Sequence, residues 1–331
     1  MNRPSQSSFR EVPHGLMFHH FHGPGHPPGQ GSIDRETFAD ILEFVGLKRI
    51  LPAERWLELA LAGKLPDGAL CVTLDDGLPC QRDLAVPVLE ALNLTAFIFP
   101  YSRAFEGWLD PLELHRYVRV HCYPDVDAFY AHFDAVLAAS AHAEAAARTL
   151  ERFEPRAYYP ECPFFSDGDK RFRYQRDEAL GPSAYHELMG RLMDELGVAA
   201  ADLRGKLCLG AGEIRALGER GHVVGLHTHS HPTNLAAMAP EAQRAEYADN
   251  LSALAGIIPG RPVVAAHPCG SYGPETLDIL RDLGIKIAFR SNMNHPRRRG
   301  LEWPRQNHAN ILIELRADDP ATPPTAGRRR K

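Results

Sequence analysis

The chain has 331 residues, of which 44% are hydrophobic and 24% charged, as in an ordinary globular protein with a sizeable core. A formal net charge of -5 excludes a general attraction to nucleic acid, and no stretch approaches the ~18 apolar residues of a membrane-spanning helix. The six cysteines are scattered without a C-x-x-C pair, and the first residues lack a signal-peptide pattern. We therefore expect a cytoplasmic protein with reduced thiols, no nucleic-acid partner and no membrane span.

The first hundred residues alternate between strand and helix patterns. The expected strands are residues 16–21, 47–51, 69–72 and 94–99, and the expected helices are 35–45, 53–62 and 84–92. Asp34 has the short polar side chain of a helix N-cap. This alternation is typical of a parallel sheet with helices packed on its outside.

The middle of the chain, residues 110–205, breaks the alternation. Its patterns are mainly helical, over residues 126–139, 141–153 and 184–196, so we expect a helical insertion that also offers a surface for a homodimer. Within it, four basic residues alternate with aromatic ones: Lys170, Arg171, Arg173 and Arg176. Such a strip could bind a phosphate or a sugar nucleotide, although a solvated helix face is the commoner meaning of a charge run.

The alternation resumes after the insertion. Helices are expected at residues 212–220, 240–254 and 273–283, and strands at 222–226, 263–266, 285–289 and 311–315. About seven strand–helix units favour an α/β fold of the irregular (β/α)7 barrel type over an open sheet. We thus expect one barrel in two parts, residues 1–109 and 206–316, with the insertion at 110–205 and a disordered basic tail at 317–331.

Two groups of polar residues lie at the carboxyl ends of expected strands. In barrels of this kind, catalytic residues lie at that end. Asp75 and Asp76 end one strand, and His227 and His231 follow another at a spacing that would place both imidazoles on one face of a helical turn. Asp76 with the two histidines forms a three-ligand set that leaves an open position, as in catalytic zinc sites. A divalent ion acidifies a bound water, and Asp75 could take its proton. Zn²⁺ suits this set best, while Co²⁺, Ni²⁺ and Fe²⁺ also fit.

Three motifs together resemble the polysaccharide deacetylase (NodB-homology) family, carbohydrate esterase family four. They are Thr73-Leu74-Asp75-Asp76-Gly77, His227-Thr228-His229-Ser230-His231 and His267-Pro268-Cys269-Gly270. The resemblance covers residues 16–105 and 206–315 and implies a NodB-like (β/α)7 barrel. It further implies a metal on Asp76, His227 and His231, with Asp75 as catalytic base and the backbone N–H of Cys269 facing the oxyanion. The implied reaction is hydrolysis of an N-acetyl group on an amino sugar, with release of acetate.

The sequence departs from the family pattern at two places. The family's arginine that orients the base is replaced by Ala266, and Arg305 in a Trp-Pro-Arg segment is expected to take that role. The late Leu-x-His that supplies a general acid is absent. Its replacement is expected among His19, His20, His267 and His308, with His19 ranked first because its Met-Phe-His context resembles some members. A hydrogen-bonded structural histidine is the alternative for each of them.

Three functions remain open from the sequence. The first is a metal-dependent N-deacetylase acting on an amino sugar or an intracellular glycan precursor, nucleotide-linked or lipid-linked. The second is hydrolysis of another, non-sugar or cyclic amide at the same site, which the two departures keep open. The third, a non-catalytic carbohydrate-binding descendant, ranks last because the base and all three metal ligands are present. His267 and Arg305 are expected beside the substrate, and His229 is expected to pack behind the ligands.

Overall fold

The computed structural model describes residues 11–159, 165–294 and 300–318. The chain folds into two compact units. Unit 1 comprises Met1–Trp108 and Cys208–Lys331, and unit 2 comprises Leu109–Leu207. Most of the tail expected at 317–331 lies outside the described residues, and its first two residues belong to a helix instead.

The described part of unit 1 contains seven parallel strands. They are β1 His14–Phe18, β2 Leu70–Asp76, β3 Ala96–Pro100, β4 Val223–Val224, β5 Val264–Ala266, β6 Ile287–Phe289 and β7 Arg305–Asn307. Five of them pair in the order β4-β3-β2-β1-β7, and β5 pairs with β6. Two parallel bridges join these two sheets. Leu226, just after β4, pairs with Ala265 of β5, and Phe289 of β6 pairs with Trp303, just before β7, so strand pairing runs in a ring. The α/β class with parallel strands is therefore confirmed, and the ring is that of a seven-stranded barrel.

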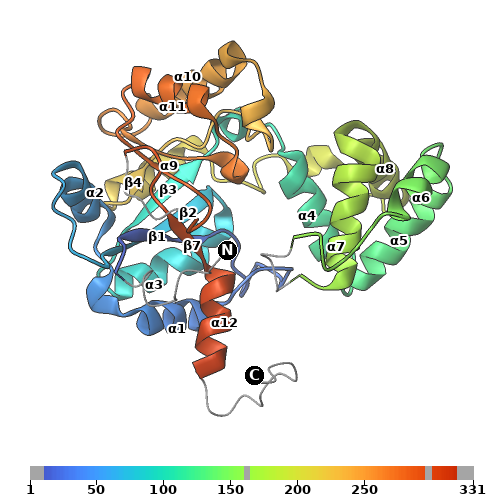
Figure 1. The fold of residues 1–331 in the computed structure, drawn as a ribbon, viewed down its shortest axis with the longest axis horizontal. Helices are drawn as coiled ribbons and strands as arrows, with labels where there is room; N and C mark the ends of the chain where they lie inside the picture. The colour runs from blue at the N-terminus through green and yellow to red at the C-terminus, as the bar shows by residue number, and fades with distance from the viewer. Residues whose placement is uncertain (1–10, 160–164, 295–299, 319–331) are drawn as a thin grey trace. The chain divides into compact units, whose positions relative to one another are not determined.

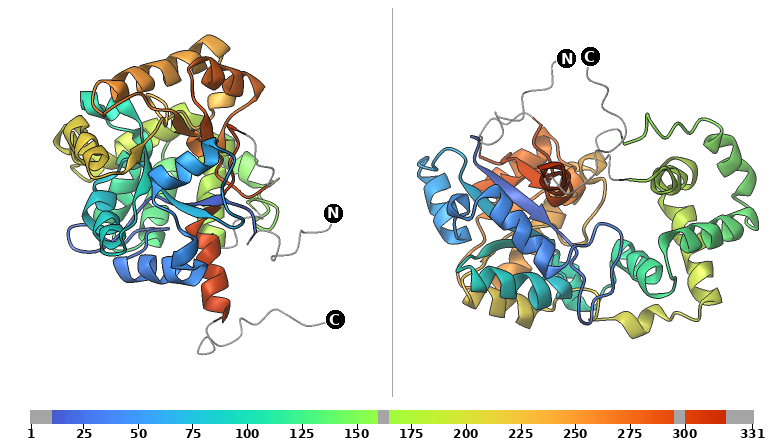
Figure 2. Two further views of the ribbon diagram at one scale, coloured as in Figure 1. Left: turned by 90° about the vertical axis from the view of Figure 1, so that its left-hand side faces the viewer. Right: turned by 90° about the horizontal axis from the view of Figure 1, so that it is seen from below.

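Helices surround these strands (Figures 1 and 2). They are α1 Arg35–Val45, α2 Ala53–Leu61, a π-helix Gln81–Ala85 that leads into α3 Val86–Ala91, α9 Ala211–Glu219, α10 Pro240–Ala255, α11 Pro274–Asp282 and α12 His308–Asp318. Asp34 caps α1 as predicted, because its side chain accepts a hydrogen bond from the Thr37 N–H at 2.8 Å.

Two expected strands are wrong. Residues 47–51 form a 3₁₀ turn, Leu47–Arg49, and only Ile50 makes a bridge, to Leu70. Residues 311–315 lie in helix α12, although their branched side chains favour a strand. The Asn307 side chain accepts a hydrogen bond from the Ala309 N–H at 2.9 Å, which starts the helix immediately after β7.

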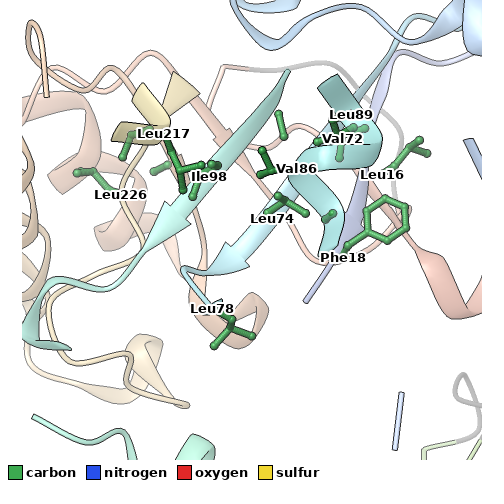
Figure 3. Close-up of a cluster of buried hydrophobic side chains, with 14 of the residues drawn as sticks. Leu16, Phe18, Val72, Leu74, Leu78, Val86, Leu89, Ile98, Leu217 and Leu226 are labelled. Atoms are coloured by element: carbon green, nitrogen blue, oxygen red, sulfur yellow. The ribbon is translucent and has the colours of Figure 1, made fainter. Parts of the chain in front are cut away.

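The core of unit 1 has two layers because its strands are buried on both faces. Val72 and Leu74 of β2 pack with Val86 and Leu89 of α3 in one cluster (Figure 3). Cys71, the neighbour of Val72, belongs to a second cluster with the rings of Trp56, Phe97, Phe99, Phe289 and Trp303. Successive residues of a strand point to opposite faces, so nearly continuous apolar runs are what such buried strands require.

The junction between β4 and β5 depends on a glycine. A Cβ atom at Gly225 would lie 2.6 Å from side-chain atoms of Phe99 and Val264, and 2.8 Å from the Val264 carbonyl oxygen. No larger residue fits without moving the backbone, so Gly225 permits the close approach that closes the ring at this side. The metal-ligand candidate His227 follows two residues later.

Unit 2 is helical, with α4 Pro111–His121, α5 Val126–Ala138, α6 Ala143–Leu150, α7 Asp167–Tyr174, a π-helix Gln175–Leu180 and α8 Gly181–Glu195 (Figure 1). Its core combines aliphatic side chains with the rings of Phe129, Phe133, Phe172 and Tyr185. In neither unit does a described helix have both the length and the apolar character needed to cross a membrane.

Candidate metal centre

The backbone separates the two carboxylates that end β2. Asp76 has a φ of 77°, in the left-handed region, so its side chain leaves the direction that the strand would otherwise give it. Gly77 follows with a φ of 67°, and a Cβ there would lie 2.8 Å from the Pro100 Cβ of β3. The Asp-Asp-Gly sequence thus turns the chain sharply against the neighbouring strand and sends Asp75 and Asp76 to different partners.

Asp76, His227 and His231 lie together with ligand atoms all within 4.8 Å of one another. The Asp76 Oδ1 atom lies 3.4 Å from His227 Nε2 and 3.5 Å from His231 Nε2. This oxygen is buried and has no hydrogen-bond partner among the described residues. An orphaned carboxylate oxygen facing two imidazole nitrogens is the donor set that a divalent cation would satisfy.

The charge state of Asp76 favours a cation. Burial alone would raise its pKa, but His227, His231 and His19 outweigh burial and hold the pKa of Asp76 below its usual value. The carboxylate is therefore ionised at neutral pH. Two imidazoles and one carboxylate are ligands that zinc and other divalent transition metals share.

Neighbours orient the His227 ring. Its Nδ1–H donates to the Ala266 carbonyl oxygen at 3.0 Å, so Nε2 presents its lone pair toward Asp76. Its backbone N–H donates to Asn250 Oδ1 at 2.9 Å, and Asn250 Nδ2 donates to the Pro100 carbonyl at 3.3 Å. His231 stacks on Tyr101 with ring centroids 5.2 Å apart. Strands β3 and β5 and helix α10 thereby all contribute to the position of the ligands.

His227 and His231 do not lie on a helical turn, so the predicted helical spacing of the two imidazoles is wrong. Residues 227–231 form a bend in which Thr228 has a φ of 67° and His231 a φ of 52°. Glu246 of α10 holds this bend, since its carboxylate accepts hydrogen bonds from the His229 N–H at 3.0 Å and the Ser230 N–H at 2.8 Å. It also accepts from the Ser230 hydroxyl at 2.5 Å. The imidazoles converge because the loop is clamped, not because the backbone is helical.

Asp75 forms a buried ion pair with Arg305. Arg305 Nη1 donates to Asp75 Oδ1 at 2.6 Å, and Arg305 also donates to Thr73 Oγ1 at 3.3 Å and to the Arg290 carbonyl at 2.7 Å. Burial alone would raise the pKa of Asp75, but Arg305, His227 and His19 outweigh it and keep that pKa below its ordinary value. The other oxygen, Oδ2, lies 3.7 Å from His19 Nε2.

His19 is partly exposed at the end of β1. Burial lowers its pKa, and the charges of Asp76 and Asp75 only partly oppose this effect. The imidazole is therefore neutral at pH 7. His20 stacks beside it with ring centroids 6.5 Å apart.

Two other predicted histidines lie in the wall of the barrel instead. His267 uses both ring nitrogens, with Nε2 3.0 Å from the Leu301 carbonyl oxygen and Nδ1 3.4 Å from the Tyr247 hydroxyl. His308 Nε2 lies 3.1 Å from the Gly31 carbonyl oxygen. Burial lowers the pKa of each histidine to about 4. The His267 ring therefore offers no nitrogen for proton transfer at the carboxylates.

The remaining predicted residues surround the ligand loop and the end of β5. Cys269 has an exposed side chain and lies in a 3₁₀ turn, Pro268–Gly270, with a φ of 52°. His229 Nδ1 lies 3.0 Å from the Ser102 hydroxyl oxygen, which fits the expected packing role behind the ligands.

Sequence motifs did not reveal the residues that hold this site from behind. Gln81, in the π-helix, donates to the carbonyl oxygens of His19 at 2.9 Å and Asp75 at 2.6 Å. Glu246 and Asn250 hold the ligand loop from α10. In the sequence, these two residues are marked only by their i, i+4 spacing. Each precedes an apolar residue, Tyr247 or Leu251, so both lie at the edge of an apolar helix face.

Comparison with known proteins agrees with this architecture. Residues 189–288 match the model of the family described as Polysaccharide deacetylase. No curated protein matches the sequence. Three solved structures share the fold, each with 92% of this chain aligned. The Streptococcus pyogenes deacetylase PplD in complex with acetate has 15% identity, a TM-score of 0.51 and 98% of its own chain aligned. IcaB from Ammonifex degensii has 16% identity, a TM-score of 0.51 and 97% aligned. A de-N-acetylase from Aggregatibacter actinomycetemcomitans has 10% identity, a TM-score of 0.54 and 100% aligned.

Replacing Glu246 with Gln tests the clamp on the ligand loop. The amide cannot accept all three hydrogen bonds with the strength of a carboxylate, so we expect zinc affinity to fall by about tenfold or more while the fold is kept. Equilibrium dialysis with zinc measures the affinity. Glu241→Gln, an exposed residue on the same helix, is the matched control. Equal zinc affinity in both variants would remove Glu246 from the site.

Acid should destabilise the protein partly through His308. The unfolded chain titrates near the usual value of ~6.5 and the folded chain near 4, so stability falls as pH decreases through this interval. Between pH 7 and pH 5 the histidine should contribute about 2 kcal/mol to that loss. Urea unfolding at both pH values should therefore show a smaller loss for His308→Gln than for the parent. An identical loss in parent and variant would contradict the assignment.

Proposed function

We propose that the chain is a hydrolase of the polysaccharide deacetylase type, metal-dependent, that removes the acetyl group from an N-acetylated amino sugar. The observation that carries the proposal is the pairing of two different carboxylates at one strand end. Asp76 faces the two histidines, and Asp75 is held by Arg305 beside them. A metal site with an oriented, ionised base next to it is the arrangement that amide hydrolysis by water requires.

Asp76, His227 and His231 would hold the divalent ion, with Zn²⁺ favoured and Co²⁺, Ni²⁺ or Fe²⁺ also suited to these donors. A bound ion supplies Lewis acidity toward an amide carbonyl and lowers the pKa of water. The protein contributes the fixed donor geometry through Ala266, Asn250 and the Glu246 clamp.

Asp75 is assigned as the general base. Arg305 occupies its Oδ1 atom, which leaves Oδ2 to accept a proton from the attacking water. The water oxygen forms a bond with the acetyl carbon, and the C–N bond then breaks. The backbone N–H of Cys269 is proposed to face the developing oxyanion, as the family resemblance implies. Acetate and a free amine are the products, and the bound acetate in the PplD structure matches the expected leaving product.

His19 is assigned to carry the proton to the leaving amine. Its Nε2 lies 3.7 Å from Asp75 Oδ2, so a proton taken up by Asp75 can pass to the neutral imidazole and on to the nitrogen. The imidazole is partly open to solvent, with 31% of its side chain exposed. His267 is excluded from this assignment because both of its ring nitrogens have partners in the barrel wall.

The substrate is proposed to be an amino sugar or a glycan precursor, nucleotide-linked or lipid-linked. A cytoplasmic location and a homodimer stay predictions from the sequence. The alternative, hydrolysis of another amide, rests on Ala266 and on the missing Leu-x-His. The complete set of Asp75, Asp76, His227 and His231 argues against a non-catalytic binding protein.

The substitution Asp75→Asn tests the base directly. Acetate release from N-acetylglucosamine, its UDP conjugate and chitooligosaccharides should fall about 10²- to 10⁴-fold, because a general base typically contributes that much. The metal content should stay at the parent level, since Asp75 is not a ligand.

Asp249→Asn, an exposed residue on α10, serves as the control and should keep parental activity. Parental turnover in Asp75→Asn would refute its role as base. A metal-loaded parent that releases no acetate from any of these sugars would favour the other amide substrate.

A further inference from the structure

The basic residues of the strip differ in what they contact within unit 2. Lys170 donates to the Pro155 carbonyl oxygen at 3.0 Å, and Arg171 pairs with Asp134 at 2.7 Å. Both therefore stabilise the helical unit itself. Arg173 of α7 and Arg176 of the following π-helix are instead partly buried, and Arg119 of α4 joins them.

Aromatic rings hold these arginines in place. The Arg173 guanidinium carbon lies 4.0 Å from the Phe165 ring centroid. The corresponding atom of Arg119 lies 5.8 Å from the centroid of Phe129 and 5.9 Å from that of Phe172. Stacking of this kind fixes the guanidinium plane while leaving its edge N–H groups free to donate.

The Phe172 ring brings these groups together, because its centroid lies 5.9 Å from the Arg119 guanidinium carbon and 6.1 Å from the Tyr185 ring centroid, and Arg173 is the next residue. Burial, together with the charges of Arg176 and Arg119, holds the pKa of Arg173 below its usual value. Positive charges that are partly buried at short range are unfavourable unless anions offset them.

Among the described residues of the unit, Asp177 offsets one of these charges. Asp177 binds Arg176 with both oxygens, at 2.6 Å and 2.8 Å. Asp169 accepts from the Tyr130 hydroxyl at 2.5 Å and from the Ser166 N–H at 2.8 Å. Within the described part of the chain, Arg119 and Arg173 form no ion pair.

Neutral groups beside the arginines also lack partners. Tyr185 of α8 is buried, and its hydroxyl makes no hydrogen bond with a described residue, although Arg119, Arg176 and Arg173 all act on it electrostatically. The ring of His115 lies 5.0 Å from that of Tyr185, and its Nδ1 is buried without a partner in the described structure. A buried nitrogen without a partner therefore lies beside the Tyr185 ring.

We propose that Arg119, Arg173 and Arg176, with the Tyr185 hydroxyl, form a binding site for a phosphate group in unit 2. Phosphate is dianionic near neutral pH and offers several acceptor oxygens, which matches three guanidinium donors better than a single carboxylate does. Arg176 lies in a π-helix, Gln175–Leu180, a distortion that is frequently found at functional sites. This site is independent of the proposed deacetylation.

Isothermal titration of the full metal-loaded chain with inorganic phosphate and pyrophosphate tests the proposal. We expect one saturable site per chain that weakens as salt is raised. Arg119→Gln and Arg173→Gln should each weaken binding about tenfold or more, the usual effect of losing a charge-assisted hydrogen bond. Arg173→Lys should retain part of the affinity, and Tyr185→Phe should lose a smaller part.

Arg171→Gln is the matched control, because it removes an arginine from the same helix whose charge is already paired with Asp134. It should bind pyrophosphate within about twofold of the parent, as expected for a residue outside the site. Circular dichroism and melting curves of all variants show whether the unit stays folded.

Vesicles identify the source of the phosphate group. Sedimentation with phosphatidic acid vesicles, but not with phosphatidylcholine vesicles, would support a lipid headgroup if it is lost in Arg173→Gln. Pyrophosphate binding without sedimentation would support a free phosphorylated ligand. The proposal is overturned if none of these probes binds, if Arg171→Gln loses as much affinity as Arg173→Gln, or if Arg173→Gln binds like the parent, since the phosphate would then lie elsewhere.

Discussion

The buried ion pair between Arg305 and Asp75 is the interaction on which the arrangement of this site depends. It links β7 to β2 across the intervening strand β1, and both side chains are almost completely buried. Such a pair is tolerated only when further hydrogen bonds satisfy it, here through Thr73 and the Arg290 carbonyl. Loss of one partner alone would leave an uncompensated charge, with a cost of about 3–5 kcal/mol. The pair also fixes which oxygen of Asp75 remains open.

Several residues around the candidate metal centre have a strained backbone conformation. Asp76, Thr228, His231 and Cys269 all have positive φ values, and all lie at or just beyond strand ends of the barrel. Such conformations cost of order 1–3 kcal/mol each and persist where surrounding structure determines them. Glu246 and Asn250 hold the ligand loop in this way, because they accept hydrogen bonds from its backbone N–H groups. These contacts fix the geometry of the candidate ligands, as a binding site built on supporting hydrogen bonds requires.

The sequence predicted the parts of the site that are encoded in adjacent residues. Asp75, Asp76, His227 and His231 occur in short motifs after apolar strands, and the structure brings them together. Strand periodicity also predicted most of the barrel. It failed at residues 311–315, where Asn307 caps a helix despite branched side chains, and at 47–51, where only Ile50 reaches a strand.

The remaining features depend on contacts between distant segments, which no local pattern encodes. Gln81 joins the ends of β1 and β2, and Glu246 reaches back to a loop sixteen residues earlier in the chain. The convergence of the ligand histidines comes from that clamp, so the same spacing on a helix would have given a different site. In unit 2, Arg119 of α4 reaches the Phe172 ring of α7 only through the packing of the helices.

The most direct test of the metal centre is a cobalt titration of the full chain followed by visible absorption. We expect one Co²⁺ per chain, with a spectrum of nitrogen and oxygen ligands and no thiolate charge-transfer band. The signal should disappear in His227→Ala and remain in His229→Ala, a histidine of the same loop whose ring faces Ser102. Absence of stoichiometric cobalt binding in the parent, or equal loss in both variants, would contradict the assignment of Asp76, His227 and His231 as the metal site.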